Sequence, residues 1–299
     1  MASPLELRVS VVIPNHNYAQ YVGQAIESAL AQTLPPFEVV VVDNGSTDDS
    51  LEVLKAFGAR IRLITQENRG QSGARNRGVA ECRGELIAFL DADDVWMPEK
   101  LAKQVQFFRD AEVGLVYSGY TLVDRDLVPA QSFRPEIRGR VLRKFAEGPG
   151  AVISGGESTA VIRRACFEKL GVYDLDLSMS AGWDMYRRIA GSYRIEVVRE
   201  SLMLYRQHGS NASRRADVYE HDVLLKLKKM FADPAAAEVF SLRRQCYGKA
   251  FLAISGNYLH AGQIFKSAEY LTKALVMWPR AAAYALGTPV RVLRRMGKR

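Results

Sequence analysis

The first 118 residues of the chain alternate between apolar runs and amphipathic segments, and this alternation constrains the fold most. The apolar runs, each typical of a buried strand, are 8–14, 37–43, 60–66, 86–91 and 113–118. The segments with helical spacing between them are 21–32, 48–57, 72–82 and 99–110. Strands that alternate with helices of about 10–15 residues indicate βαβ units and a parallel sheet covered on both faces. We therefore predict an α/β fold with a Rossmann-like, mostly parallel sheet.

Polar residues gather where the first four predicted strands end. The clusters read PNHN, DNGSTDD, QENRG and DADD, and each contains a carboxylate or an amide. In an open α/β sheet, ligands bind in the crevice at the carboxyl ends of the strands. Loops are polar in any protein, but four clusters at one edge of a sheet favour a binding site over unrelated surface loops.

The formal net charge of +8 over 299 residues is unevenly distributed. From Tyr270 onward there are seven basic residues and no acidic ones, whereas the rest of the chain holds 34 basic and 33 acidic residues. Because the body is nearly neutral, we expect it to bind no nucleic acid. The basic character belongs to the end of the chain.

The cysteine pattern and the chain start bear on the cellular compartment. Cys82, Cys166 and Cys246 are isolated, and an odd number without metal-binding spacing predicts neither a disulfide framework nor a zinc site. The first ten residues hold no apolar signal-peptide core, and no run of about 18 apolar residues predicts a spanning helix. We expect a cytoplasmic protein.

Five motifs between Val9 and Ser213 resemble those of the family 2 glycosyltransferases, which have the GT-A fold. In chain order they are VSVVIPNHNYAQYVGQAIESALAQT, VVVVDNGSTDDS, ENRGQSGARNRG, GELIAFLDADDVW and YRQHGSNAS. The resemblance implies an inverting hexosyltransferase that moves a sugar from a nucleotide-sugar donor, with a UDP-sugar favoured. It also implies a saccharide or lipid-linked saccharide acceptor in cell-surface polysaccharide assembly.

The resemblance also suggests a division of the chain. Residues 1–214 are expected to form the GT-A domain, with a nucleotide-binding half at 1–118 and an acceptor-side half at 119–214. Residues 215–299 are expected to form a helical region. Its segment 249–279 has the apolar spacing of one tetratricopeptide helix pair, which we interpret as a packing hairpin because a single copy forms no array.

The DADD cluster predicts a metal site. Hard cations take oxygen ligands, often one or two carboxylates plus phosphate oxygens, and such a cation stabilises a leaving diphosphate. By resemblance to the DxD motif, Asp91 faces the ribose and Asp93 binds Mn2+ or Mg2+. The resemblance makes His208 a further ligand, and a nitrogen ligand suits manganese better than magnesium. Asp94 is expected to cap the segment that follows.

The strand-end clusters would hold the nucleotide-sugar. By resemblance, Asp43 accepts a hydrogen bond from the base, while Asn44 stands where the family's pattern has a second aspartate. Arg75 would reach the diphosphate, because the planar arginine donors bind phosphate in a bidentate manner. The other residues expected at the nucleotide-sugar are Pro14, Asn15, Asn17, Ser46 and Ala92.

Inverting transfer needs a general base that takes the proton of the acceptor hydroxyl. The family often supplies it from an ED pair before a helix, but the matching positions here are Ala181 and Gly182. Asp184 is the preferred candidate, with an ion pair to arginine in the same helix as its alternative role. Glu157 is the reserve candidate, and Trp183 could stack on a sugar on the acceptor side.

Two other functions remain open. A sugar nucleotidyltransferase also uses a Rossmann-like fold and carboxylate-bound metal, but it usually opens with a Gly-rich basic phosphate loop, which IPNHNYAQ lacks. A non-catalytic scaffold would keep the nucleotide pocket and act through its C-terminal helices, and the missing ED pair favours it.

The end of the chain predicts a basic amphipathic helix. Thr288 and Pro289 suit its first positions, and apolar and basic residues alternate after them in VRVLRRMGKR. Such a helix suits an anionic membrane surface, so we expect peripheral binding at the inner face of the plasma membrane, with a solvated terminus as the alternative.

Overall fold

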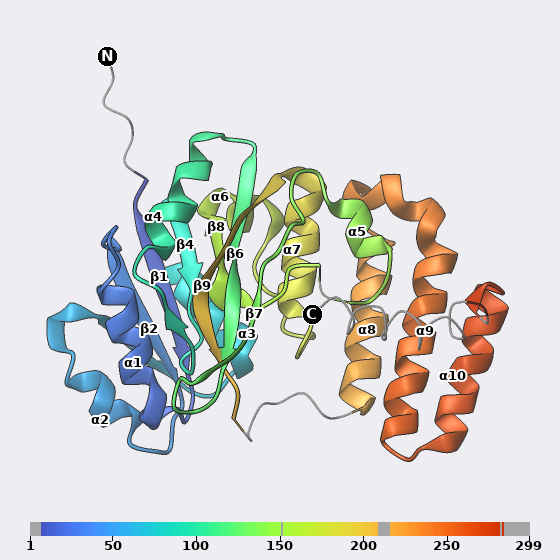
Figure 1. Cartoon of the computed structure of the whole chain (residues 1–299), viewed down its shortest axis with the longest axis horizontal. Helices are drawn as coiled ribbons and strands as arrows, with labels where there is room; N and C mark the ends of the chain where they lie inside the picture. The colour runs from blue at the N-terminus through green and yellow to red at the C-terminus, as the bar shows by residue number, and fades with distance from the viewer. Residues whose placement is uncertain (1–6, 151, 209–215, 282, 284–299) are drawn as a thin grey trace. The chain divides into compact units, whose positions relative to one another are not determined.

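The computed structural model describes residues 7–150, 152–208, 216–281 and 283 (Figure 1). It divides into two compact units. The first comprises Met1–Val141 and Val152–Ala212, and the second comprises Leu142–Ala151 and Ser213–Arg299. The predicted tail helix from Thr288 lies outside the described residues.

Four parallel strands form one half of the sheet in the first unit, as predicted. They are β1 (Val9–Asn15), β2 (Glu38–Asn44), β3 (Arg62–Gln66) and β4 (Leu86–Phe89). Their order in space is β3-β2-β1-β4, so the chain order reverses beside β1. Residues of β1 and β2 pair in register up to Asn15 and Asp43, which brings the polar residues that end both strands together.

The other half of the sheet is mixed, with the full order β3-β2-β1-β4-β8-β6-β9-β5 and with β7 paired to β6. β8 runs antiparallel to both β4 and β6, and β9 runs parallel to β6. The predicted strand at 113–118 therefore exists but is separated from β4 by β8. The bounds of these strands are β5 (Val95–Trp96), β6 (Val113–Val123), β7 (Pro129–Phe133), β8 (Ala160–Arg163) and β9 (Arg194–Arg206).

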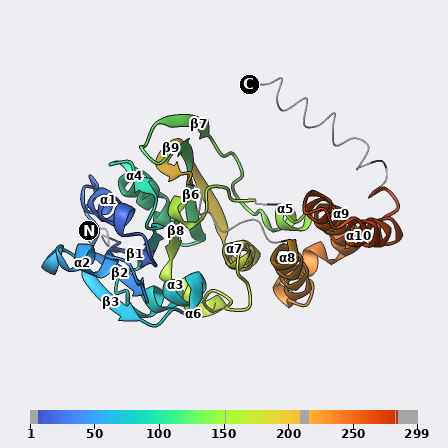
Figure 2. The same ribbon diagram turned by 90° about the horizontal axis from the view of Figure 1, so that it is seen from below.

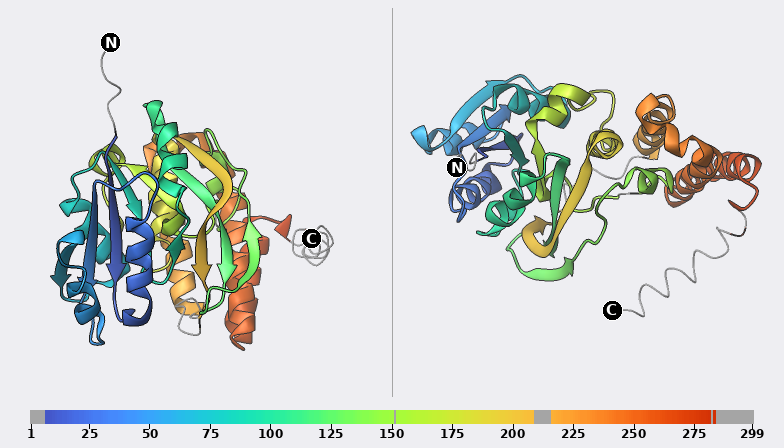
Figure 3. Two further views of the ribbon diagram at one scale, coloured as in Figure 1. Left: turned by 60° about the vertical axis from the view of Figure 1, so that its left-hand side comes forward. Right: turned by 90° about the horizontal axis from the view of Figure 1, so that it is seen from above.

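Helices cover both faces of this sheet, with α1 and α4 on one face and α3, α6 and α7 on the other (Figures 2 and 3). Their bounds are α1 (Ala19–Leu30), α2 (Ser50–Lys55), α3 (Gly70–Glu81), α4 (Lys100–Val105), α6 (Arg164–Leu170) and α7 (Ala181–Ser192). Short 3-10 turns are η1 (Gly58–Arg60), η2 (Gln106–Arg109) and η3 (Glu157–Thr159).

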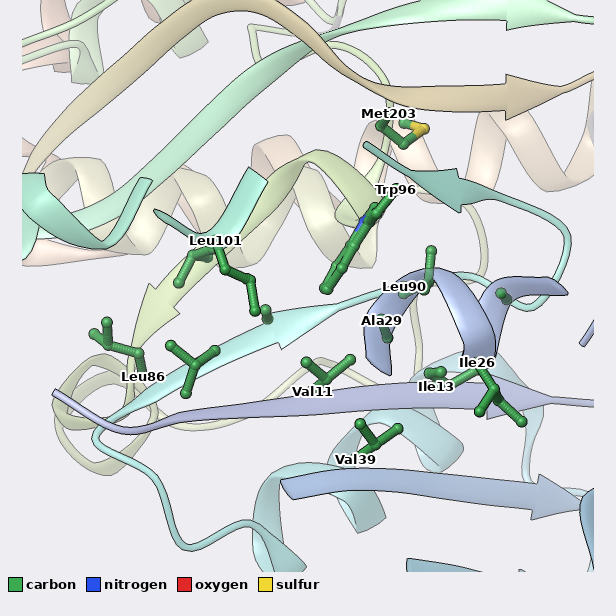
Figure 4. Close-up of a cluster of buried hydrophobic side chains, with 14 of the residues drawn as sticks. Val11, Ile13, Ile26, Ala29, Val39, Leu86, Leu90, Trp96, Leu101 and Met203 are labelled. Carbon is green, nitrogen blue, oxygen red and sulfur yellow. The ribbon is translucent and has the colours of Figure 1, made fainter. Parts of the chain in front are cut away.

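The core under α1 follows from sequence spacing. The buried residues of α1 recur every three or four positions and form one apolar stripe: Val22, Ala25, Ile26 and Ala29. They pack with Val11 and Ile13 of β1, whose side chains point to the same face because strand residues alternate (Figure 4). Burial on both faces fixes the strand ends that carry the polar clusters.

The opposite face of β1 is close-packed against α3. Val12 lies beneath Gly78, and a Cβ added at position 78 would lie 2.3 Å from Val12 Cγ1. Only a glycine therefore lets α3 approach the sheet so closely. Its position matters because α3 carries Arg75 toward the site.

We expect Gly78→Ala to lower the free energy of unfolding by about 1–3 kcal/mol, because the added methyl group overpacks a buried strand. Urea denaturation measures the change. Gly23→Ala on α1 is the control, since its Cβ would meet Val53 Cγ1 at an ordinary 3.7 Å. The control should stabilise by about 0.5–1 kcal/mol through helix propensity. Equal effects of the two substitutions would show that the close approach is not limiting.

The second unit is helical. It contains α5 (Leu142–Ala146), α8 (Ala216–Met230), the 3-10 segment η4 (Pro234–Leu242), α9 (Arg243–His260) and α10 (Ile264–Met277). α9 and α10 form a hairpin through a turn at Gly262, whose φ of 74° favours glycine, and α8 packs beside α9 (Figure 1). Tyr258 and Tyr270 stack, and both hydroxyls donate to Glu220 of α8.

Among the described residues, no helix combines the length and apolar character needed to span a membrane.

Candidate active site

The ends of β1 and β2 form a buried polar cluster around Asp43. Asn15 Nδ2 donates to Asp43 Oδ1 at 3.0 Å, and Ser46 Oγ donates to the same oxygen at 2.5 Å. Asp43 is 1% exposed, so these bonds fix the orientation of its carboxylate. The Oδ1 atom of Asn15 is buried without a hydrogen-bond partner in the described structure. The sequence-predicted residues Asn15, Asp43 and Ser46 are thus brought together.

Asn17 and Asn44 hold the loops around this cluster. Asn17 has a φ of 59°, and its Oδ1 accepts hydrogen bonds from the backbone N–H groups of Thr47 at 2.7 Å and Asp48 at 3.3 Å. Asn44 Nδ2 donates to Asn68 Oδ1, and its Oδ1 accepts from Gln66. Both amides therefore shape the edge of the site. Pro14 is buried within β1 itself.

The DADD turn after β4 distributes its carboxylates among three separate partners. Arg75 Nη2 donates to Asp91 Oδ1 at 2.8 Å, and His208 Nε2 lies 2.9 Å from Asp93 Oδ2. Asp94 accepts from the backbone N–H of Arg206 at 3.2 Å. Each carboxylate of the turn is therefore held in a separate direction.

Asp94 is a buried anchor, and the predicted capping role is wrong. The next helix, α4, begins at Lys100, and Asp94 instead bonds to the end of β9. It is 2% exposed, and burial together with Asp93 and Asp91 raises the pKa of its carboxyl group well above the usual range. Ala92 is also buried, which fixes the turn from inside.

Arg206, at the end of β9, contacts the DADD turn and was not among the predicted site residues. Its side chain donates to the carbonyl oxygens of Asp93 and Arg125 and to Gln24 Oε1, and it lies 4.5 Å from the centroid of the Tyr21 ring. The signal was available in YRQHGSNAS, because an arginine two positions before His208 reaches the same turn from β9. Arg206 thus joins strands distant in sequence.

Asp93 and His208 are the residues that fit a divalent cation. A carboxylate oxygen and an imidazole nitrogen converge at 2.9 Å, and this mixed donor pair suits Mn2+. Their side chains are 17% and 8% exposed, so the pair is partly screened from solvent. Within the described residues, no group of three or more His, Cys, Asp or Glu side chains is placed to hold a metal. Phosphate oxygens of a substrate and water are ligands that such cations commonly take in addition.

Aromatic rings of α1 and the preceding loop support His208. The ring centroid of His208 lies 5.7 Å from that of Tyr18 and 5.4 Å from that of Tyr21. Burial, with Asp93 and Asp91, raises the pKa of Tyr18 to about 12, so its hydroxyl stays protonated at neutral pH. The imidazole is therefore oriented by packing as well as by Asp93.

Arg75 lies between two carboxylates. Its Nη2 is 2.8 Å from Asp91 Oδ1 and 3.2 Å from Glu157 Oε2, and its side chain is 4% exposed. Burial alone would lower the pKa of Arg75, but Glu157 and Asp91 outweigh it and raise the pKa. In this state the arginine charge is directed at Asp91 and Glu157, and its predicted reach to a diphosphate is not visible.

Asp184, the preferred base candidate, lies in the buried ion pairs that were its alternative role. Its Oδ1 accepts from Arg187 Nη2 at 3.0 Å, and its Oδ2 accepts from Arg188 Nε at 2.9 Å. Asp184 is 2% exposed, and Arg188 also donates to the carbonyl oxygens of Leu170 and Val172. Asp184 thus orients Arg188, whose hydrogen bonds join α7 to the end of α6 and the residues after it. Trp183, next to Asp184, is partly exposed.

The family of this fold and site follows from comparison with known proteins. A family model described as Glycosyl transferase family 2 matches residues 10–171, which include every strand end of the site from β1 to β4. The chain belongs to glycosyl transferase family 2. The resemblance seen in the sequence motifs is confirmed.

Three proteins similar in sequence to this family 2 chain are named as glycosyltransferases or as a polysaccharide synthase. An uncharacterized glycosyltransferase of Nostoc sp. is 34% identical over 69% of this chain and 66% of its own length. The putative teichuronic acid biosynthesis glycosyltransferase TuaG of Bacillus subtilis is 34% identical over 42% of this chain and 51% of its own length. Chondroitin synthase of Escherichia coli is 39% identical over 40% of this chain and 18% of its own length. The chain spans only part of each relative.

Solved structures of TarS and of a mannosyltransferase share the fold. S. aureus TarS 1-349 in complex with UDP-GlcNAc has a TM-score of 0.68 at 18% identity and covers 92% of this chain and 81% of that chain. A Pyrobaculum calidifontis mannosyltransferase in complex with GDP-Man and Mn2+ has a TM-score of 0.59 at 22% identity. This match covers 99% of this chain and 87% of that chain. These likenesses confirm the predicted GT-A fold with a helical C-terminal region.

Proposed function

We propose that this chain transfers a sugar, with inversion, from a nucleotide-sugar donor to an acceptor hydroxyl. The observation that carries the proposal is the common location of two clusters at the carboxyl edge of the parallel strands. One is the Asn15–Asp43–Ser46 cluster, and the other is the Asp93–His208 pair. Family membership supports the reaction class, and the likeness to TarS bound to UDP-GlcNAc supports a UDP-sugar as the favoured donor.

The Asp43 cluster is assigned to the base end of the donor. The fixed carboxylate of Asp43 and the unpartnered Oδ1 of Asn15 are acceptors, which suits the N–H of a uracil ring. Asp91 and Ala92 would lie along the ribose and the diphosphate. Asn17 and Asn44 act through the loops that they hold, and Arg75 supplies positive charge near the diphosphate.

Asp93 and His208 would hold a divalent cation, Mn2+ or Mg2+, together with oxygens of the donor. When bound, the cation would stabilise negative charge on the departing nucleoside diphosphate. Neighbouring residues hold the two ligands in place. Arg206 fixes the backbone of Asp93, and Tyr18 and Tyr21 pack against the imidazole of His208. The Mn2+ complex of the Pyrobaculum mannosyltransferase supports the choice of metal.

The acceptor is assigned to a saccharide or a lipid-linked saccharide. The relatives named for teichuronic acid and chondroitin synthesis support polysaccharide assembly as the setting. Trp183 at the start of α7 offers a partly exposed aromatic face for a sugar.

A donor panel tests the proposed function. The protein is incubated with UDP-, GDP- and dTDP-sugars and Mn2+, and release of the nucleoside diphosphate is measured with and without chelator, in the presence of saccharide acceptors. We expect chelator-sensitive release from a UDP-sugar. Binding of a donor without turnover would favour a non-catalytic scaffold. Release or consumption of pyrophosphate would favour a nucleotidyltransferase.

We also propose that the basic tail brings the enzyme to an anionic membrane surface. Five of the last nine residues are basic, and each is worth about 1 kcal/mol near such a surface. A chain ending at Thr288 should lose most of its binding to vesicles that contain phosphatidylserine, while binding of both chains to neutral vesicles stays low. Vesicle flotation at low salt measures this. Unchanged binding of the truncated chain to anionic vesicles would show that the tail is not the anchor.

A further inference from the structure

Glu157 lies in the site although it belongs to a loop far from the DADD turn in sequence. Its Oε2 is 3.2 Å from Arg75 Nη2, and the same nitrogen is 2.8 Å from Asp91 Oδ1. The next residue, Ser158, accepts a hydrogen bond from the backbone N–H of Asp91 at 3.0 Å and, through its carbonyl oxygen, one from Trp96 Nε1 at 2.8 Å. The η3 turn is thereby fixed to the end of β4, and the Glu157 carboxylate is fixed beside Asp91.

The other oxygen of Glu157 occupies space that α7 leaves open. A Cβ built on Gly182 would lie 1.8 Å from Glu157 Oε1, so any side chain at position 182 would collide with this carboxylate. Gly182 is in the first turn of α7, and Tyr186 follows one turn later on the same face. The absence of a side chain at Gly182 is therefore what admits the Glu157 carboxylate to this place.

The remaining carboxylates of the site are committed to other partners. Asp184 is bonded through both oxygens to arginine, Asp94 to the end of β9, and Asp43 to Asn15 and Ser46. Glu157 pairs with Arg75 through Oε2, while its Oε1 lies in the space that Gly182 leaves. Burial raises the pKa of Glu157, and Arg75 opposes that rise. A carboxylate at this place with a raised pKa is a better proton acceptor than an ordinary glutamate.

We propose that Glu157 is the general base of the transfer, placed by the glycine at position 182. This inference rests on the proposed function. Glu157 Oε1 takes the proton of the acceptor hydroxyl while the hydroxyl oxygen forms a bond to the anomeric carbon of the donor. The bond from that carbon to the diphosphate oxygen breaks, and its electron pair leaves with the nucleoside diphosphate. The protonated Glu157 then returns its proton to solvent.

Glu157→Gln tests this assignment. The amide keeps the size of the side chain but cannot take the proton, so turnover with UDP-sugar and Mn2+ should fall about 100-fold or more. The affinity for UDP with Mn2+, measured by calorimetry, should change less than about threefold. Glu168→Gln, which alters an exposed glutamate on α6, is the matched control and should retain turnover.

A second variant and a pH profile keep the proposal testable should the glutamine disturb folding. In a Glu157→Ala background the space beside Gly182 is open, and adding Gly182→Asp should restore turnover at least tenfold. For the wild type, turnover should fall as the pH drops through the raised pKa of Glu157, which Arg75, Asp91, Tyr173 and Tyr186 surround. The falling limb should therefore lie above the pKa of an ordinary glutamate, and the Glu157→Ala, Gly182→Asp variant should shift it.

Two failures are distinguishable. If the wild type binds no nucleotide-sugar and turns over none, the proposed function fails and Glu157 has no reaction to serve. If the wild type turns over a donor and Glu157→Gln does so within about threefold of its rate, the proposed function is supported but the base assignment is wrong.

Discussion

Asp93→Asn should remove nearly all metal-dependent turnover. The substitution keeps the shape of the side chain but deletes the negative charge that faces His208 at 2.9 Å. Loss of a residue that supports a metal ligand typically costs 10–100-fold in metal affinity or activity, so loss of a ligand charge should cost about 100-fold or more. Turnover of UDP-sugar at increasing Mn2+ measures both the rate and the apparent metal affinity.

The control for this variant is Asp126→Asn, because Asp126 is an exposed aspartate whose side chain is 72% accessible. It should leave both turnover and metal dependence unchanged. The residual rate of Asp93→Asn should be insensitive to chelator. A variant that kept the metal dependence of the wild type would show that Asp93 is not a ligand.

Asp184→Asn should have the largest effect on stability. The carboxylate is 2% exposed and pairs with Arg187 and Arg188, so its removal leaves two largely buried guanidinium groups without their anion. Breaking a buried ion pair typically costs about 3–5 kcal/mol. We expect the free energy of unfolding to fall by roughly 3 kcal/mol, measured by urea denaturation.

Two comparisons make the Asp184 result decisive. Glu27→Gln breaks an exposed ion pair with Arg60 and should cost no more than about 1 kcal/mol. Turnover per folded molecule of Asp184→Asn should exceed that of Glu157→Gln by at least tenfold. The reverse order, with normal stability and lost turnover in Asp184→Asn, would return the base role to Asp184.

The parallel half of the fold is predictable from the sequence because its signals are local. The strands β1, β2 and β4 are runs of mostly buried apolar residues, and the helix α1 that follows β1 has a clear apolar stripe. Once the strands are parallel, their polar ends must meet at one edge of the sheet. Asp43 and Asp93 could be placed at that edge on this argument alone.

The strand order of the mixed half of the sheet and the contacts that hold the DADD turn depend on residues far apart in the sequence, so local patterns do not predict them. β8 inserts between β4 and β6, and no sequence period announces that order. Arg206 reaches the DADD turn from a strand more than a hundred residues away, with its guanidinium hydrogen-bonded to Asp93 O at a sequence separation of 113. The close approach of the Glu157 carboxylate to Gly182 likewise cannot be predicted from the sequence, because the two residues are brought together only by the fold.

A crystal structure with UDP-GlcNAc and Mn2+, with the metal located by its anomalous scattering, tests the proposed donor and metal site. We expect manganese in contact with Asp93 Oδ2 and His208 Nε2, and the uracil ring against Asp43 and Asn15. Manganese held by other residues, or an ordered nucleotide away from the ends of β1, β2 and β4, would contradict it.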